Sequence, residues 1–155
     1  MNKDVDIKYM EEALKEARRA LELDEAPIGA IITMGDKIIS RGHNRRNTDK
    51  NPLAHAEILA INEAAKVIGD WRLEDCTLYV TLEPCPMCAG AIVQARIPRL
   101  VFGAPSPKAG FAGSIMNILQ LESLNHQVDI RDGILQEECS QIIKAYFQNM
   151  RKQAK

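Results

Sequence analysis

Four side chains in two short segments have the types and the spacing of a catalytic zinc site. His55 and Glu57 stand two positions apart in the first segment, and Cys85 and Cys88 form a C-x-x-C pair in the second. A catalytic zinc ion takes three protein ligands and leaves its fourth position to water, whereas a structural zinc ion takes four. We therefore predict that His55, Cys85 and Cys88 bind one zinc ion and that Glu57 is the spare carboxylate.

Such a set of groups can activate water for hydrolysis. Zinc lowers the pKa of water from near 16 to roughly 7, so that hydroxide forms at neutral pH. Glu57 would take a proton from the attacking water and deliver it to the substrate, acting as general base and then as general acid. Taken alone, the two thiols could be a redox dithiol or unrelated cysteines, and His55 could be a packed helix residue. The combination of both motifs favours zinc.

The segment around His55 is predicted to begin a helix. Asn51 is a good N-cap, and Pro52 suits the first helical position because its missing N–H would be unpaired there. We expect this helix over residues 52–68. Residues two apart do not share a helix face, so His55 and Glu57 can reach one pocket only from the exposed first turn.

The two thiols are predicted to lie where a strand gives way to a helix. Residues 77–81 have the β-branched and aromatic character of a strand. Cys85 precedes Pro86, which pushes Cys85 out of the α region and itself suits the first turn of a helix. Cys85 is therefore expected to cap a helix that runs until Pro98. A helix N-terminus favours the thiolate form, which is the form that binds zinc.

Hydrophobic periodicity predicts the remaining elements. Further helices are expected at 4–23, 115–121 and 135–152, further strands at 28–34, 37–42, 100–103 and 128–130, and a Pro- and Gly-rich loop of functional length at 104–114. Strands separated by helices indicate a mostly parallel sheet with helices on both faces, and a hairpin of the first two strands makes it mixed. The predicted fold is a three-layer α/β/α arrangement around a mixed five-stranded sheet.

Length and composition predict a single domain, residues 1–155. The 155 residues are 46% hydrophobic, enough for one sizeable core and too few for two typical domains. No apolar run approaches the roughly 18 residues of a membrane span, and the first residues have no signal-peptide core, so we expect a cytoplasmic protein without a membrane partner. Cysteines in such a protein are metal ligands or buried thiols, and Cys76 and Cys139 are expected in the core.

The overall charge does not indicate a nucleic-acid binder. The formal net charge is −1, whereas domains that bind nucleic acid are usually strongly basic. Two local runs are basic, residues 41–50 and residues 150–155, and either could contact phosphate. Taken alone, each run is equally well explained by ordinary solvated charges.

The pattern H-x-E with P-C-x-x-C is the signature of zinc-dependent nucleobase deaminases. Over nearly its whole length the chain resembles the bacterial tRNA-specific adenosine deaminases of the cytidine deaminase-like superfamily. The metal motif specifies only the superfamily, and the resemblance to the tRNA branch comes from longer stretches. The segments that carry it are residues 26–30, 42–44, 52–57, 77–91, 102–104, 113–116 and 125–126.

The resemblance implies hydrolysis of the wobble adenosine in a tRNA anticodon stem-loop to inosine, with release of ammonia. It further implies a homodimer with one zinc ion per subunit and no organic cofactor. A stacked base is out of reach, so the nucleotide must be flipped out or lie in a single-stranded loop. The residues that match the family's site are His55, Cys85 and Cys88 as zinc ligands, Glu57 as proton shuttle, Asn44 as a contact to the flipped base, and Ile28, Ala54 and Pro84 as pocket-lining residues.

The chain departs from the family's pattern in one loop. Many relatives carry acidic residues after the Phe-Gly-Ala of 102–104, where this chain has Pro-Ser-Pro-Lys at 105–108. An alternative function is deamination of a free base or nucleotide, of guanine or cytosine type, with the same zinc site. A rival from another class is a non-catalytic zinc module that binds RNA or a protein. Glu57 argues against that rival, because a structural site has no use for a carboxylate beside an open metal position.

Overall fold

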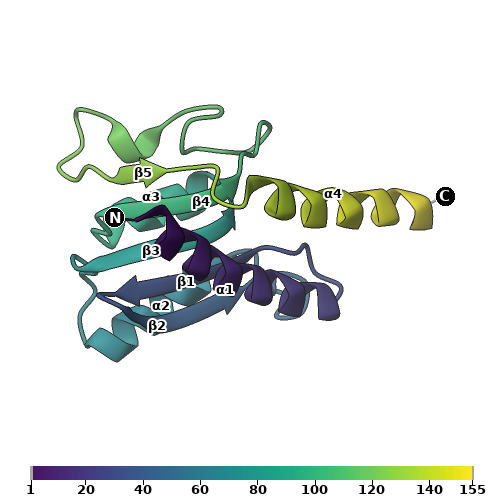
Figure 1. The fold of residues 1–155 in the computed structure, drawn as a ribbon, viewed down its shortest axis with the longest axis horizontal. Coiled ribbons are helices and arrows are strands. Elements are labelled where there is room, and N and C mark those ends of the chain that lie inside the picture. The colour runs from purple at the N-terminus through teal and green to yellow at the C-terminus, as the bar shows by residue number, and fades with distance from the viewer. Residues whose placement is uncertain (1, 155) are drawn as a thin grey trace.

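The computed structural model describes residues 2–154 and contains every predicted helix and strand, with bounds shifted by a few residues (Figure 1). The helices are α1 (Lys3–Glu22), α2 (Ala56–Ile68), α3 (Pro86–Gln94) and α4 (Gln136–Gln153), with a short 3-10 helix, η1 (Ile118–Gln120). The strands are β1 (Gly29–Met34), β2 (Lys37–His43), β3 (Cys76–Leu82), β4 (Arg99–Ala104) and β5 (Asp129–Arg131).

The five strands form one sheet in the order β2-β1-β3-β4-β5. The predicted mixed sheet is confirmed, but the expectation that it is mostly parallel is wrong. β1 pairs antiparallel with both β2 and β3, whereas β3 with β4 and β4 with β5 are parallel pairs. The reason is that the connection from β2 through α2 passes over β1, so β3 pairs with β1 and not with β2.

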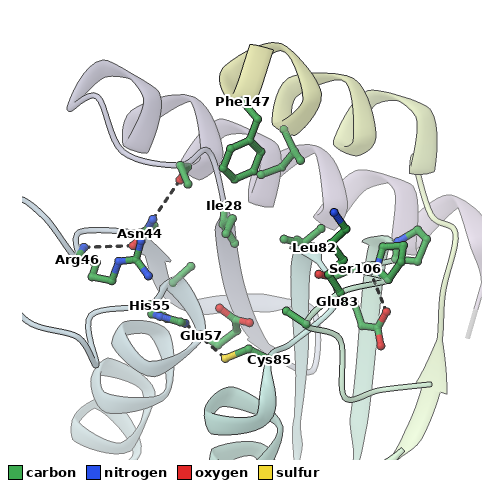
Figure 2. A pocket seen from close by; sticks show the side chains of 17 residues that line it. Ile28, Asn44, Arg46, His55, Glu57, Leu82, Glu83, Cys85, Ser106 and Phe147 are labelled. Carbon is green, nitrogen blue, oxygen red and sulfur yellow. Dashed lines mark hydrogen bonds between the residues drawn. The ribbon is translucent and has the colours of Figure 1, made fainter. Parts of the chain in front are cut away.

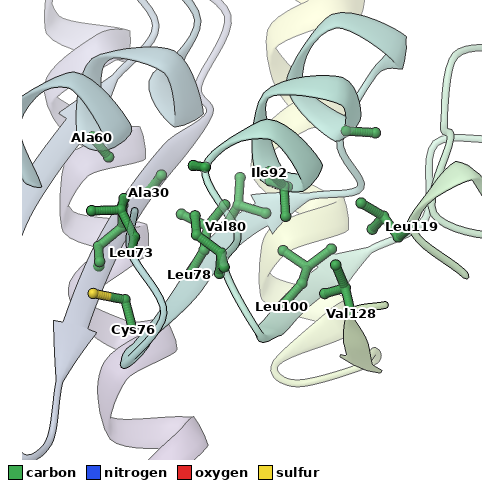
Figure 3. Packing of buried hydrophobic residues seen from close by; sticks show 14 of the residues in the cluster. Ala30, Ala60, Leu73, Cys76, Leu78, Val80, Ile92, Leu100, Leu119 and Val128 are labelled. Atoms are coloured by element: carbon green, nitrogen blue, oxygen red, sulfur yellow. The ribbon is translucent and has the colours of Figure 1, made fainter. Parts of the chain in front are cut away.

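Side chains along the central strands alternate between two cores, as the two-residue period of a strand requires. On one face, α2 and α3 cover Ala30, Ile32, Leu78, Val80, Leu100 and Phe102 (Figure 3). On the other face, α1 and α4 cover Ile31, Tyr79 and Val101. Helices on both faces confirm the three-layer α/β/α prediction. Cys76 lies in the first core and Cys139 in the second, both buried as predicted.

The start of α2 differs from the prediction. The helix begins at Ala56 with His55 as its N-cap, and not at Pro52 after Asn51. The Asn51 side chain accepts a hydrogen bond from the Leu53 N–H at 2.9 Å, and this local contact closes a turn in place of the first helical turn. The shift places His55 at the helix entrance.

Helix α4 packs on the sheet at its start and projects beyond it towards the C-terminus (Figure 1). Cys139 is buried near its start, whereas Phe147 and Met150 are 49% and 47% exposed. The helix therefore docks with its first turns while its end reaches out. Of the basic run at 150–155, Lys155 lies outside the described residues. Within residues 2–154, no helix combines the length and the apolar character needed to cross a membrane.

Candidate metal and catalytic site

His55 and Cys85 occupy equivalent positions at the starts of two helices. His55 is the N-cap of α2, Cys85 is the N-cap of α3, and Cys88 lies in the first turn of α3. Neither N-cap side chain caps its own helix by a hydrogen bond. These side chains turn towards one another instead. His55 Nδ1 lies 3.6 Å from Cys85 Sγ (Figure 2) and 3.6 Å from Cys88 Sγ.

The three donor atoms fit a zinc ion. All of them lie within 4.8 Å of one another. Two ligands of a tetrahedral zinc ion, with Zn–S of ~2.3 Å and Zn–N of ~2.05 Å, stand ~3.6 Å apart. The observed nitrogen-to-sulfur distance of 3.6 Å is the same. The cluster therefore has the chemistry and the spacing of a three-ligand zinc site with one position left for water.

The pKa values of the two thiols are shifted in opposite directions. Hydrogen bonding to Cys88, and then to His55, lowers the pKa of the Cys85 thiol to about 4, against the opposing effect of burial. The hydrogen bond to Cys85 raises the pKa of the Cys88 thiol, and burial and the nearby Glu57 charge act in the same direction. These shifts favour the thiolate at Cys85 and the proton at Cys88. A metal that binds both sulfurs must displace that proton.

Glu57 lies in the first turn of α2 and points into the same space as Cys85 (Figure 2). The residue is only 4% exposed. Burial raises the pKa of its carboxyl to about 7, and the nearby Cys85 charge acts in the same direction. A carboxyl group with a pKa near neutrality is suited to take up and to return a proton. His55 and Glu57 thus reach one pocket from the start of α2.

A cavity of about 540 Å³ opens over these groups, a volume typical of a small-molecule site. Figure 2 shows Asn44 and Arg46 on one side of it and Ser106 on the other. The residues that line it are Ala26, Ile28, Asn44, Arg46, His55, Ala56, Glu57, Leu82, Glu83, Cys85, the loop segment 105–109, Ile143 and Phe147. The loop that departs from the family's pattern is therefore a wall of the cavity.

Two of the four predicted substrate-binding residues line this cavity. Ile28 and Asn44 do so, and Asn44 is held by hydrogen bonds from its amide to the Ala26 carbonyl at 3.4 Å and from the Arg46 N–H to its oxygen at 3.1 Å. Among the described residues, Ala54 and Pro84 are not part of the lining. Both are buried, and their carbonyls accept the N–H groups of Arg45 and Phe111.

Glu25 holds the wall that carries Asn44 and Arg46. It is 1% exposed, and its carboxylate accepts the backbone N–H groups of Asn47 at 3.2 Å and Thr48 at 2.6 Å. Sequence reasoning gave Glu25 no role. Its partners lie more than 20 residues away and bind it through backbone N–H groups, joined by the Thr48 side chain, so no local pattern identifies it.

Helix α4 also contributes to the cavity. Ile143 and Phe147 line it, although apolar residues at helical spacing usually indicate a face that packs on the core. Half of the Phe147 surface remains exposed, so an aromatic ring stands at the cavity with room for a ligand against it. An apolar residue at helical spacing gives the same signal in a core and in a pocket wall, which is why the sequence could not separate them.

The three-layer fold, with a His/Cys/Cys cluster and a buried carboxylate at the starts of two helices, defines the class of nucleobase deaminases with the cytidine deaminase-like fold. A family model described as MafB19-like deaminase matches residues 4–151. The tRNA-specific adenosine deaminase of Bacillus subtilis (strain 168) is 53% identical over 147 residues, which cover 95% of this chain and 91% of that protein.

Solved structures agree with the sequence comparison. A chain from a study of A-to-I editing by tRNA:A34 deaminases at the wobble position of transfer RNA superposes with a TM-score of 0.84 at 43% identity, over 87% of this chain and 98% of that chain. The guanine deaminase from Nitrosomonas europaea superposes with a TM-score of 0.77 at 24% identity, over 90% of this chain and 83% of that chain, and this likeness is one of fold alone. The chain therefore belongs to the MafB19-like deaminase family and to the tRNA-specific adenosine deaminases.

Proposed function

We propose that this enzyme converts the wobble adenosine of a tRNA anticodon to inosine by hydrolysis, with release of ammonia. The observation that carries the chemistry is the position of buried Glu57 beside the donor atoms of His55, Cys85 and Cys88, on the floor of the cavity. The similarity to a relative named tRNA-specific adenosine deaminase, at 53% identity, supports the choice of substrate.

His55, Cys85 and Cys88 would hold one zinc ion per subunit, because they supply three donors of the right kind and spacing. Zinc at this position supplies a Lewis acid that makes water nucleophilic at neutral pH. Glu57 takes one proton from the water while the water oxygen adds to C6 of adenine. Glu57 then passes this proton to N1 of the ring. Glu57 then carries the remaining hydroxyl proton to the amino group. Ammonia leaves, and the former water oxygen becomes the carbonyl of inosine.

The cavity suits a nucleotide that is part of a longer chain. Arg46 and Lys108 line it, and cationic side chains attract the phosphates on either side of a bound nucleotide. Glu57 lies too deep to reach a base stacked in a helix, so the target must be flipped out or come from a single-stranded loop such as an anticodon.

Asn44 is the residue that we propose to contact the edge of the flipped base. Its amide nitrogen and its oxygen each make one hydrogen bond within the protein, so each keeps capacity for one more. Ile28 would contact the base from the cavity lining. Ala54 and Pro84 would shape the pocket from behind, through the loops that their carbonyls hold.

We further propose that the enzyme is a cytoplasmic homodimer. Large apolar side chains that are more than half exposed include Leu53, Val67, Trp71, Ile115 and Met116, and their burial by a second copy would be favourable. A cytoplasmic location suits an enzyme that acts on tRNA. Light scattering on the purified protein measures the oligomeric state directly.

The decisive experiment offers the zinc-loaded enzyme a transcribed anticodon stem-loop with a wobble adenosine and, separately, free guanine and free cytosine. Inosine in the digested RNA and ammonia in solution are measured. A stem-loop with the adenosine moved one position within the loop serves as the matched control. We expect both products with the wobble stem-loop alone. Activity on the free bases without activity on the stem-loop would overturn the proposal in favour of a free-base deaminase.

A further inference from the structure

Glu83 follows β3 directly, and its carboxylate is buried under the loop of residues 105–114, here called the wall loop. The residue is 3% exposed. Its two oxygens accept the backbone N–H groups of Ser106 at 3.0 Å, Ala112 at 2.9 Å and Ser114 at 3.0 Å, and the Ser114 hydroxyl donates to the same carboxylate. A carboxylate offers about four acceptor sites. The wall loop therefore occupies all of them.

Gly110 shows how closely the wall loop wraps this carboxylate. A Cβ atom added at Gly110 would overlap the carboxyl carbon and both oxygens of Glu83. Gly110 does not have a positive φ, so its backbone conformation is open to other residues. Glycine is required at position 110 because a side chain there would collide with the Glu83 carboxylate, and not because of the φ angle.

The wall loop links Glu83 to the cavity in which we propose that the substrate binds. Residues 105–109 line the cavity, and Lys108 among them brings a cation to it. Figure 2 shows Glu83 and Ser106 on the side of the cavity opposite Asn44 and Arg46. Glu83 also stands two positions before Cys85, so it joins the wall loop to the segment between β3 and the start of α3, where Cys85 lies.

We propose that Glu83 is a positioning residue, whose carboxylate holds the wall loop in the shape that binds the substrate nucleotide and thereby sets the enzyme's affinity for RNA. It does not touch the reacting atoms, because its acceptor sites are taken by the loop. The choice of RNA as the substrate rests on the proposed function, whereas the hydrogen bonds of Glu83 are independent of it. Loss of the carboxylate is expected to raise KM and to leave the metal cluster and Glu57 in place.

The first test is Glu83→Gln, which keeps the size of the side chain but turns one oxygen into a nitrogen that can only donate. We expect KM for the wobble-adenosine stem-loop to rise at least about tenfold, the effect of losing one hydrogen bond to a charged group. We expect kcat to change by less than about threefold and the zinc content to stay the same. The matched control is Asp70→Asn, because Asp70 also accepts a backbone N–H but does not line the cavity.

A second measurement needs no substrate. Hydrogen exchange of the amides of Ser106, Ala112 and Ser114 is compared between wild type and Glu83→Gln. We expect these amides to exchange faster in the variant, while the amides of β3 keep their protection. This readout separates the inference from the proposed function, because it holds or fails whether or not the enzyme accepts RNA.

A pair of substitutions tests the contact with Gly110. Gly110→Ala alone is expected to raise KM, because its methyl group would displace the Glu83 carboxylate. Glu83→Ala is expected to raise KM as well. The double variant should be no worse than Glu83→Ala, because the added methyl group then meets no carboxylate. Effects that simply add would contradict a direct contact and overturn the inference.

Two further outcomes would overturn the inference. One is native KM together with native amide protection in Glu83→Gln. The other is a fall in kcat at unchanged KM, which would assign Glu83 to the chemical step. If Glu83→Gln fails to fold, Ser114→Ala and Gly110→Ala decide in its place, since each disturbs the same carboxylate from the loop side. Native KM in both would refute the positioning role.

Discussion

His55 Nδ1 lies 3.6 Å from Cys85 Sγ, although 30 residues separate the two along the chain. Each residue is the N-cap of a helix, His55 of α2 and Cys85 of α3. Helix N-termini carry partial positive charge, which favours the thiolate at Cys85 and hence the binding of a cation by its sulfur. The fold thus creates the donor set by starting two neighbouring helices at one place.

Removal of one thiol is expected to abolish zinc binding. Cys88→Ser leaves two strong ligands, too few for a zinc site in this class. We expect zinc content, measured by elemental analysis after dialysis, to fall from one ion per chain to near none. The matched control is Cys76→Ala, because Cys76 is also buried but lies in the core. Retention of stoichiometric zinc by Cys88→Ser would exclude Cys88 as a ligand.

Glu57→Gln is expected to keep zinc and to lose activity. The amide cannot take up the proton of the attacking water, and general acid–base catalysis typically contributes about 10²- to 10⁴-fold to the rate. We expect kcat for the stem-loop to fall by at least about 10²-fold, with zinc content unchanged. Glu63→Gln is the matched control, since Glu63 lies on the same helix but is exposed. A variant at Glu57 with substantial activity would remove this residue from proton transfer.

Local sequence patterns were sufficient for much of the fold and for the grouping of His55, Cys85 and Cys88. The alternation of Ile31 and Ile32 between two cores follows from the period of a strand, and Pro86 marks Cys85 as a helix cap. The His55 and Cys85 motifs could be combined because zinc requires particular side-chain types, and these types can be read directly from the sequence.

The remainder depends on contacts that leave no local trace. Glu25 and Glu83 each hold a wall of the cavity mainly through backbone N–H groups, which every residue except proline possesses. Such contacts give no side-chain signal, so the sequence alone does not reveal these partners. The antiparallel pairing of β1 with β3 and the late start of α2 were missed for a similar reason, since both depend on competition between nearby and distant contacts.

Asp6 is expected to contribute strongly to stability at neutral pH. It is fully buried, accepts the Tyr79 hydroxyl at 2.8 Å, and pairs with Arg99 at 2.8 Å and 3.0 Å. Removing one charge of a buried pair typically costs about 3 kcal/mol or more. We therefore expect Asp6→Asn to lower the free energy of unfolding by about 3 kcal/mol in urea titrations at neutral pH. Asp4→Asn, on an exposed position of the same helix, is the matched control.

The contribution of Asp6 should also depend on pH. Burial alone would raise the pKa of the Asp6 carboxyl, but hydrogen bonds from Arg99 and Tyr79 and the charges of Arg99 and Arg131 outweigh burial and hold that pKa below its usual 3.8. A carboxyl with a lowered folded-state pKa gives its full stability above the unfolded-state pKa and loses it as pH falls through the folded-state pKa. The difference in unfolding free energy between wild type and Asp6→Asn should be constant above about pH 5 and shrink below about pH 4. A difference that grows on acidification would contradict this assignment.

The end of α4 is expected to contact the RNA backbone. Arg151 and Lys152 are exposed on the part of α4 that projects beyond the sheet, and Phe147 of the same helix lines the cavity. Each phosphate contact contributes about 0.7 to 0.9 to the slope of log K against log salt. The double variant Arg151→Gln/Lys152→Gln should therefore weaken stem-loop binding and reduce that slope by about 1.5, measured by fluorescence anisotropy at several salt concentrations.

A matched control for the α4 variant must remove two positive charges far from the cavity. Lys37 is the first residue of β2, after the hairpin turn, whereas the cavity lies at the opposite end of β1, next to Ile28. Lys66 lies in the last turn of α2, whereas the cavity lies at the first turn of that helix. Lys37→Gln/Lys66→Gln changes the net charge by the same amount, so it reports any general loss of attraction to RNA. If both double variants lose the same slope, binding responds to overall charge and the end of α4 makes no phosphate contact of its own. A loss confined to the α4 variant places two phosphates at Arg151 and Lys152, next to the nucleotide that enters the cavity beside Phe147.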